Sequence, residues 1–67
     1  MQRQLVTSSR IRSVGYDGNI LEIEFKDGAI YHYYDVTYSE YTTFINSDSL
    51  GSALSSLDKV HRYSRVN

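Results

Sequence analysis

The sequence contains no cysteine and no long apolar run, and its charges nearly cancel. Without cysteine, the chain forms no disulfide and cannot hold zinc through thiolates. No stretch approaches the ~20 apolar residues that a membrane-spanning helix needs, and no charged and then apolar N-terminal segment indicates a signal peptide. We therefore expect a cytoplasmic protein without a membrane partner.

The net charge of −1 excludes a generally basic protein that coats nucleic acid. The charge is nevertheless uneven along the chain. Residues 1–12 and 58–67 carry six arginines and lysines against the single acid Asp58, whereas residues 13–57 carry one lysine and seven acids. If the two ends of the chain meet in the fold, they form a basic patch on a nearly neutral protein.

The length of 67 residues corresponds to one domain, spanning residues 1–67. A chain of this size buries only ~60% of its unfolded surface, so its core is marginal. No disulfide or metal site is available to stabilise it. A homo-oligomer is therefore one way in which the protein could bury more surface.

Three segments have the pattern of β-strands, at residues 10–16, 20–25 and 29–36. The second is the clearest, because its odd-numbered residues are apolar and alternate with Glu22 and Glu24. One face of this strand should be buried and the other should largely face water. A turn at Asp17-Gly18-Asn19 joins the first two strands, since Gly and Asn accept a positive φ.

The loop at residues 26–28 sets how the second and third strands pair. A three-residue loop that ends in a left-handed Gly28 pairs residue 23 with residue 31 and residue 21 with residue 33. Tyr31 and Tyr33 then share the buried face. A two-residue turn would shift the pairing by one and bury His32 instead. We favour the first register because the two tyrosines fill more apolar volume.

Two helices should follow the strands. Thr37 and Glu40 match a capping box, which predicts a helix from Tyr38 to about Asn46. A polar residue between positions 47 and 49 should end this helix and cap a second one. The apolar stripe of that second helix consists of Leu50, Leu54, Leu57 and His61. Its last turns should hold cations, which the helix dipole favours there: Lys59, Arg62 and Arg65.

These elements predict an α+β fold, in which a three-stranded antiparallel meander is followed by two helices packed on one face of the sheet. No residue pattern points to catalysis. His32 and His61 lack a second metal ligand at helical spacing. The four glycines do not form a phosphate-binding loop, and no serine lies in a nucleophile-elbow sequence. We therefore expect no enzyme, no metal site and no cofactor.

Tyrosine is the remaining signal for function, because the chain has seven of them and no tryptophan. They cannot all be buried without partners for their hydroxyls. An exposed ring beside an arginine offers a stacking face and a phosphate partner, as single-stranded RNA or a nucleotide requires. The candidate binding residues are Tyr16, Tyr34, Arg10, Arg12 and Arg62. Tyrosine and arginine also dominate protein interfaces, so a protein partner is the alternative.

A series of short motifs adds a family to this interpretation. In chain order they are Val6-x-Ser8-Ser9-x-Ile11, Val14-Gly15-Tyr16-Asp17, Leu21-x-Ile23-x-Phe25, Gly28-x-x-Tyr31-x-Tyr33 and Ser49-x-Gly51. Together they resemble the KTSC domain family over about residues 6–63. The central Tyr-x-Tyr of that family corresponds to Tyr31-His32-Tyr33. One departure is Thr37 after Val36, where family members commonly have proline.

The resemblance implies a small bacterial or phage domain, of a kind also found at the C-terminus of some lysyl-tRNA synthetases. It implies the same α+β fold. It also implies RNA binding, with Tyr31 and Tyr33 belonging either to the core or to the binding site. The alternative function is a protein–protein interaction module, such as a small phage-encoded modulator of a host protein, or a homo-oligomer.

Overall fold

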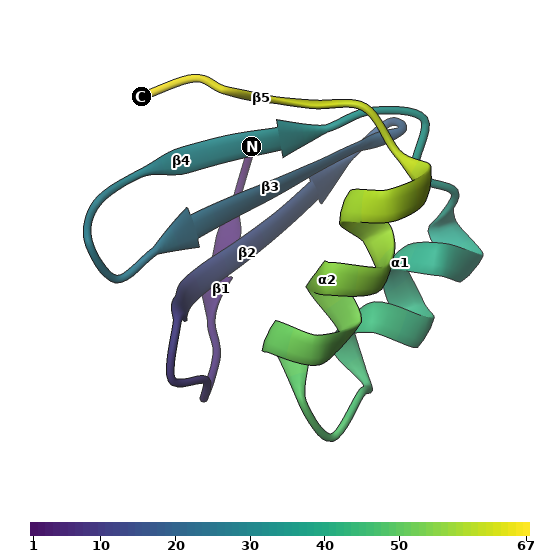
Figure 1. The fold of residues 1–67 in the computed structure, drawn as a ribbon. Helices are drawn as coiled ribbons and strands as arrows, with labels where there is room; N and C mark the ends of the chain where they lie inside the picture. Colours follow the sequence, from purple (N-terminus) through teal and green to yellow (C-terminus); the bar gives the residue numbers. More distant parts are fainter.

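The computed structural model describes all 67 residues as one sheet with two helices (Figure 1). In chain order the elements are β1 (Arg3–Leu5), β2 (Ile11–Asp17), β3 (Ile20–Phe25), β4 (Ile30–Tyr33), α1 (Tyr38–Ile45), α2 (Leu50–Val60) and β5 (Tyr63–Arg65). The five strands pair antiparallel in the order β1-β2-β3-β4-β5. Neither helix has the length and apolar character needed to cross a bilayer.

The α+β class, the antiparallel meander and the two helices on one face are confirmed, but the prediction of three strands is wrong. Strands β1 and β5 add one strand at each edge of the sheet. Each is three residues long and exposed throughout, so neither has the alternation of apolar and polar residues that reveals a strand. The basic ends of the chain therefore lie mainly at opposite edges.

The predicted register of the central hairpin is confirmed. Residue 21 pairs with 33 and residue 23 pairs with 31, so Tyr31 and Tyr33 lie on the face that the helices cover. Gly28 closes the loop in the left-handed region, with φ of +97°, and its N–H donates to the carbonyl of Phe25 at 3.0 Å. Gly18 occupies the first turn, also with positive φ.

Strand β1 lies against β2 at a position where β2 has a glycine. A Cβ atom on Gly15 would lie 2.8 Å from the carbonyl oxygen of Gln2 and 2.9 Å from Cγ of Arg3. Real Cβ atoms do not approach a backbone oxygen so closely. The absence of a side chain at this buried position therefore allows the N-terminal segment to pair with β2.

Both helices begin at the caps that the sequence provides. The Thr37 hydroxyl accepts from the N–H of Glu40 at 3.1 Å, and the Glu40 carboxylate accepts from the N–H of Thr37 at 3.0 Å. This reciprocal pair is the predicted capping box. Ser49 is the residue that caps α2, through a bond from the N–H of Ser52.

Two boundaries differ from the prediction by several residues, and the other differences are of one residue. The third predicted strand, at residues 29–36, is shorter: β4 ends at Tyr33, and Asp35 then takes a φ of +58°, which turns the chain toward α1. The second helix ends at Val60, because His61 is extended, with φ of −118° and ψ of 144°. Arg62 and Arg65 are therefore not in the last turns of a helix, and Arg65 lies in β5 instead.

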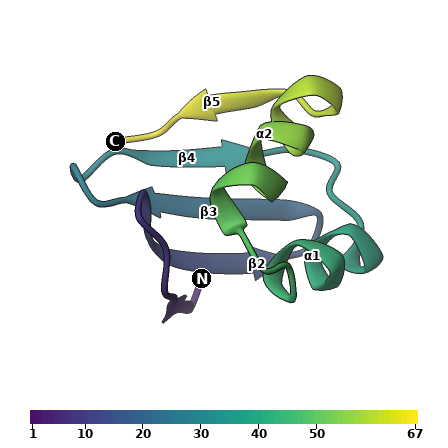
Figure 2. The same ribbon diagram turned by 60° about the horizontal axis from the view of Figure 1, so that its bottom comes forward.

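The helices cover only one end of the sheet, as Figure 2 shows. The sheet and the helices share a core of ten buried residues: Ile11, Val14, Leu21, Ile23, Tyr33, Val36, Phe44, Leu50, Leu54 and Leu57. The end of the sheet near the β3–β4 hairpin extends beyond the helices (Figure 2). Partly buried side chains at that end, including Phe25 and Tyr31, pack against the margin of the core.

The opposite face of the sheet carries paired charges. Glu22 lies 3.4 Å from Nε of Arg3 and 2.7 Å from Nε2 of His32. Glu24 accepts from the Ser13 hydroxyl at 2.7 Å and lies 3.9 Å from Arg12. These contacts leave only about a fifth of each glutamate side chain exposed. The face is therefore less exposed to water than the sequence predicts.

Candidate nucleic-acid interface

A groove runs along the part of the sheet that the helices leave open. Its aromatic wall consists of Phe25, Tyr31, Tyr33 and Tyr63, and we call it the aromatic groove. It has a volume of about 280 Å³. The rest of its lining consists of Ala29 and four charged side chains: Arg10, Arg65, Asp27 and Asp58.

The strand pairing explains why these rings gather. Tyr63 of β5 is directly opposite Tyr33 of β4, and Arg65 is directly opposite Tyr31, so all four point to the same face of the sheet. The rings of Tyr33 and Tyr63 have centroids 5.1 Å apart, and those of Tyr31 and Tyr63 are 6.0 Å apart. Phe25 meets Tyr31 edge to face at 5.5 Å.

The rings differ in their access to solvent. Tyr33 is only 3% exposed and belongs to the core, whereas Tyr63 is 48% exposed and Phe25 and Tyr31 are intermediate. The groove therefore has a rigid base and a partly open aromatic rim. A flat ligand can stack on that rim without any rearrangement of the core.

Arg10 and Arg65 bring positive charge to the groove. The guanidinium carbon of Arg10 lies 5.9 Å from the centroid of the Phe25 ring, and Nε of Arg65 donates to the backbone oxygen of Asn67 at 2.7 Å. Neither arginine lies within 4.0 Å of an aspartate or glutamate oxygen. The other three arginines do: Arg3 contacts Glu22, Arg12 contacts Glu24 and Arg62 contacts Asp35.

A second hollow continues from one end of the groove. It has a volume of about 400 Å³ and shares Arg10, Phe25 and Asp27 with the groove, and its fourth lining residue is Lys26. The two hollows are therefore neighbours, and Lys26 adds a further cation beside Arg10.

The hydroxyl of Tyr33 is fixed by an acid on α2. It donates to Oδ1 of Asp58 at 2.6 Å. Burial of the ring, the hydrogen bond and the charge of Asp58 all raise the pKa of Tyr33 well above its ordinary value. Tyr33 therefore remains a neutral hydrogen-bond donor throughout the physiological pH range.

The predicted site residues do not form one cluster. Arg10, Tyr31 and Tyr33 line the aromatic groove. Tyr34 and Arg62 meet elsewhere, with the guanidinium carbon 6.0 Å from the ring, and the Tyr34 hydroxyl is bonded to that of Ser64 at 2.6 Å. Because Ser64 pairs with His32, this contact lies on the face opposite the helices. Arg12 is on that face too, beside Glu24.

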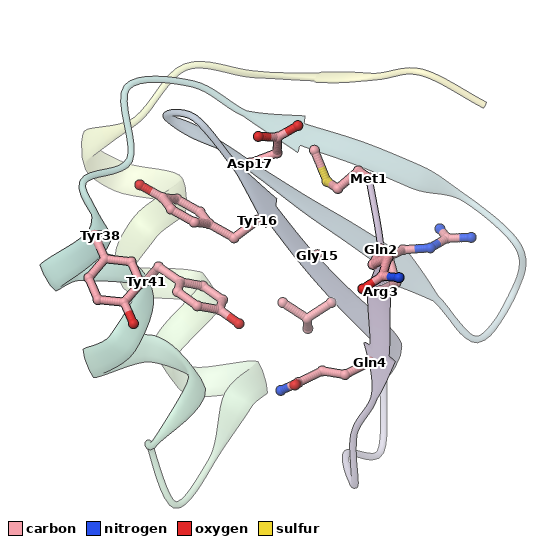
Figure 3. A pocket seen from close by; sticks show the side chains of 10 residues that line it. Met1, Gln2, Arg3, Gln4, Gly15, Tyr16, Asp17, Tyr38 and Tyr41 are labelled. Atoms are coloured by element: carbon pink, nitrogen blue, oxygen red, sulfur yellow. The ribbon is translucent and has the colours of Figure 1, made fainter.

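Tyr16 lies in a different hollow, a cleft of about 470 Å³ between β1 and α1 (Figure 3). Its ring stacks on Tyr41 with centroids 4.6 Å apart and planes 9° apart, and Tyr38 approaches both rings at 6.1 Å. Its hydroxyl donates to the carbonyl of Val36 at 2.6 Å. Burial and the nearby charge of Glu40 raise the pKa of Tyr16.

The tyrosine cleft, which Tyr16, Tyr38 and Tyr41 line, has no basic side chain directed at its rings. Arg3 is its one basic side chain, and Figure 3 shows that side chain directed away from the tyrosines. Its guanidinium is instead paired with Glu22 on the opposite face of the sheet. The cleft therefore offers aromatic surface without a basic side chain beside it, whereas the aromatic groove offers both.

Phe25, Tyr63, Arg65 and Asp58 were not among the predicted site residues. The sequence predicts that residues 62–65 continue α2, and on a helix Tyr63 and Arg65 would not face Tyr31 and Tyr33. A local signal exists, because an aromatic residue and a cation spaced by two share one face of a strand. It becomes informative only once β5 is recognised as a strand.

The chain and its fold can be compared with known proteins. A family model described as the KTSC domain matches residues 7–63. The chain belongs to the KTSC domain family. An uncharacterized protein of Stutzerimonas stutzeri (strain A1501) is 38% identical over 65 residues, which cover 94% of this chain and 92% of that protein.

The KTSC fold is also shared with a solved structure. The crystal structure of a KTSC domain protein from Yersinia pestis matches with a TM-score of 0.89 and 35% identity, covering 98% of this chain and 97% of that one. The Tyr-x-Tyr motif singled out in the sequence occupies a definite place in this KTSC domain. Tyr33 anchors the aromatic groove in the core, and Tyr31 forms part of its open wall.

Proposed function

We propose that this KTSC domain binds single-stranded RNA in the aromatic groove and acts as a binding module, not as an enzyme. The observation that carries the proposal is which arginines form an ion pair with an aspartate or glutamate and which do not. The two arginines that have no aspartate or glutamate partner, Arg10 and Arg65, both line the groove with the accessible aromatic rings. Guanidinium groups that no aspartate or glutamate neutralises, beside stacking faces, are suited to phosphates and bases of a single strand.

The chemistry of binding follows from this arrangement. A base stacks on the rim formed by Tyr63 and Tyr31, which contributes ~1–3 kcal/mol for each stacked base. Arg10 and Arg65 contact phosphates on either side. The RNA strand can extend from the groove into the neighbouring hollow at Lys26, which favours an oligonucleotide over a free nucleotide.

A titration with short RNA tests the proposal. Fluorescein-labelled hexamers are added to the protein at low salt, where release of counterions makes the electrostatic part of binding strongest. NMR chemical shifts locate the contact. We expect shifts at Phe25, Tyr31, Tyr63, Arg10 and Arg65. The absence of any shift at millimolar RNA would rule out the proposed function.

Variants separate the groove from the other candidate residues. The double variant Arg10→Ala with Arg65→Ala should weaken binding by at least tenfold and flatten the slope of log K against log salt by about 1.4, as expected for two lost phosphate contacts. Arg12→Ala with Arg62→Ala is the matched control, since it removes equal charge from the opposite face. If the control pair weakens binding and the groove pair does not, the RNA lies at Tyr34 and the groove proposal fails.

A further inference from the structure

The aromatic groove contains a carboxylate whose place is not explained by phosphate binding. Asp58 is exposed, lines the groove and has no cation within 4.0 Å. It also lies in the last turn of α2, where the helix dipole disfavours an acid. A negative charge in this position repels phosphate, so any favourable contact with RNA must be with a part of the nucleotide that donates hydrogen bonds.

The orientation of Asp58 is held by Tyr33. The Tyr33 ring is almost completely buried, so its hydroxyl has a fixed position, and it donates to Oδ1 of Asp58 at 2.6 Å. Oδ2 forms no hydrogen bond or ion pair within the protein. A carboxylate can accept about four hydrogen bonds, so Asp58 retains acceptor capacity on both oxygens while Tyr33 fixes its direction.

The four bases differ in what they present to such an acceptor. Guanine carries two adjacent donors on its Watson–Crick edge, N1–H and the N2 amino group. Adenine and cytosine each present one amino group beside an acceptor nitrogen, and uracil presents one N–H between two carbonyl oxygens. An ionised carboxylate accepts two bonds from guanine, whereas each of the other bases brings at least one acceptor against it.

We propose that the aromatic groove prefers guanine, with the base stacked beside Tyr63 and its N1–H and N2 amino group donating to Asp58. Tyr33 is the positioning residue for Asp58. This inference rests on the proposed function, because it names the base that the same groove takes. It assigns the two cations to phosphates and the carboxylate to the base edge, and so gives each of these charged groups a chemically matched partner.

Four RNA pentamers test this preference: UUGUU, UUAUU, UUCUU and UUUUU. We expect UUGUU to bind about tenfold more tightly than the other three, which is the discrimination that one good two-bond contact to a base provides. Equal affinities for the four pentamers would overturn the guanine preference and leave RNA binding intact. Failure of all four to bind would remove the proposed function itself.

The variant Asp58→Asn is the sharpest control. Its amide oxygen still accepts from the Tyr33 hydroxyl, but its amide nitrogen replaces the second acceptor with a donor. The preference for UUGUU should therefore disappear, while UUUUU should bind more tightly because a charge that repels phosphate is gone. A guanine preference that survives in Asp58→Asn would contradict the proposal.

Tyr33→Phe tests the positioning role without changing the charge of the groove. Asp58 keeps its carboxylate but loses the bond that orients it, so UUGUU should lose severalfold more affinity than UUUUU does. NMR spectra of both variants establish that the fold is retained. A loss of affinity that is equal for all four pentamers would instead indicate a structural role and contradict the assignment.

Discussion

His61 joins the two helices through Glu40. Nε2 of His61 lies 2.7 Å from Oε2 of Glu40 on α1, while Nδ1 lies 2.9 Å from the carbonyl oxygen of Tyr34. Both partners are acceptors, so His61 makes both bonds only when both of its nitrogens carry a proton. The residue that ends α2 is thereby tied to α1 and to the end of β4.

This contact predicts a dependence of stability on acid pH. Hydrogen bonds from the Thr37 N–H and from His61 lower the pKa of Glu40 in the folded state. A lowered folded-state pKa stabilises the protein above the unfolded pKa of ~4.3, and that contribution is lost as the pH falls through the folded-state value. Melting temperatures of the wild type and Glu40→Gln should therefore converge as the pH falls from about 5.5 to about 3. Parallel pH profiles for the two proteins would contradict this role of Glu40.

The cap of α1 predicts the effect of Thr37→Ala. This change removes the hydroxyl that accepts from the Glu40 N–H, and it should lower the free energy of unfolding by ~1 kcal/mol. Thr43→Ala is the matched control, because Thr43 is exposed within the same helix and makes no side-chain hydrogen bond. Urea denaturation measures both. A larger loss for Thr43→Ala would mean that the cap is not what stabilises α1.

The left-handed glycine of the central hairpin predicts a contrast between two glycine substitutions. Gly28 has a φ of +97°, where a side chain strains the backbone although no atom lies near, so Gly28→Ala should destabilise the protein by ~1–2 kcal/mol. Gly51 is in the first turn of α2, where an added methyl group would lie no closer than 4.0 Å to a neighbouring atom, and Gly51→Ala should be neutral or stabilising. Thermal unfolding distinguishes them. Equal effects would show that strain at residue 28 is absent.

The close approach at Gly15 predicts a local effect of Gly15→Ala. Its new methyl group would meet the carbonyl of Gln2 at 2.8 Å, so β1 should separate from β2 while the rest of the sheet stays folded. Amide hydrogen exchange should become faster at the β1–β2 pairs and remain slow in β3. Gly51→Ala again serves as control. Retained protection in β1 would show that the N-terminal segment can adjust.

The alternation of buried and less buried residues along β3 predicts that Ile23 contributes more to the free energy of unfolding than Ile20 does. Ile23 is fully buried between sheet and helices, and Ile23→Ala should cost ~2–5 kcal/mol, which is enough to unfold much of a domain this small. Ile20 lies in the same strand and is only partly buried. Ile20→Ala should cost clearly less in urea denaturation, and similar losses for the two variants would contradict the assigned faces.

Local patterns were sufficient to predict the central part of the fold. The β2–β4 meander, the register at Tyr31 and Tyr33, the capping box at Thr37 and the stripe of α2 each depend on residues within a few positions of one another. Strands β1 and β5 could not be predicted in this way. They are short and exposed, and they form because an edge of the sheet supplies backbone partners.

The candidate site, like the fold, could be predicted from the sequence only in part. The sequence indicated that tyrosines and arginines are the residues available for binding, and it identified Arg10, Tyr31 and Tyr33. It could not indicate that Tyr63 and Arg65 join them, because this depends on the end of α2 at His61.

The amino-acid sequence by itself determined the fold class, the central hairpin and the residue types that a ligand can meet, since alternation, glycine turns and helix caps act over short distances. Only the tertiary structure decided which arginines lack an aspartate or glutamate partner and which rings stay open. Charge pairing and exposure depend on the side chains that folding brings close, and Arg10 and Arg65 come from opposite ends of the chain.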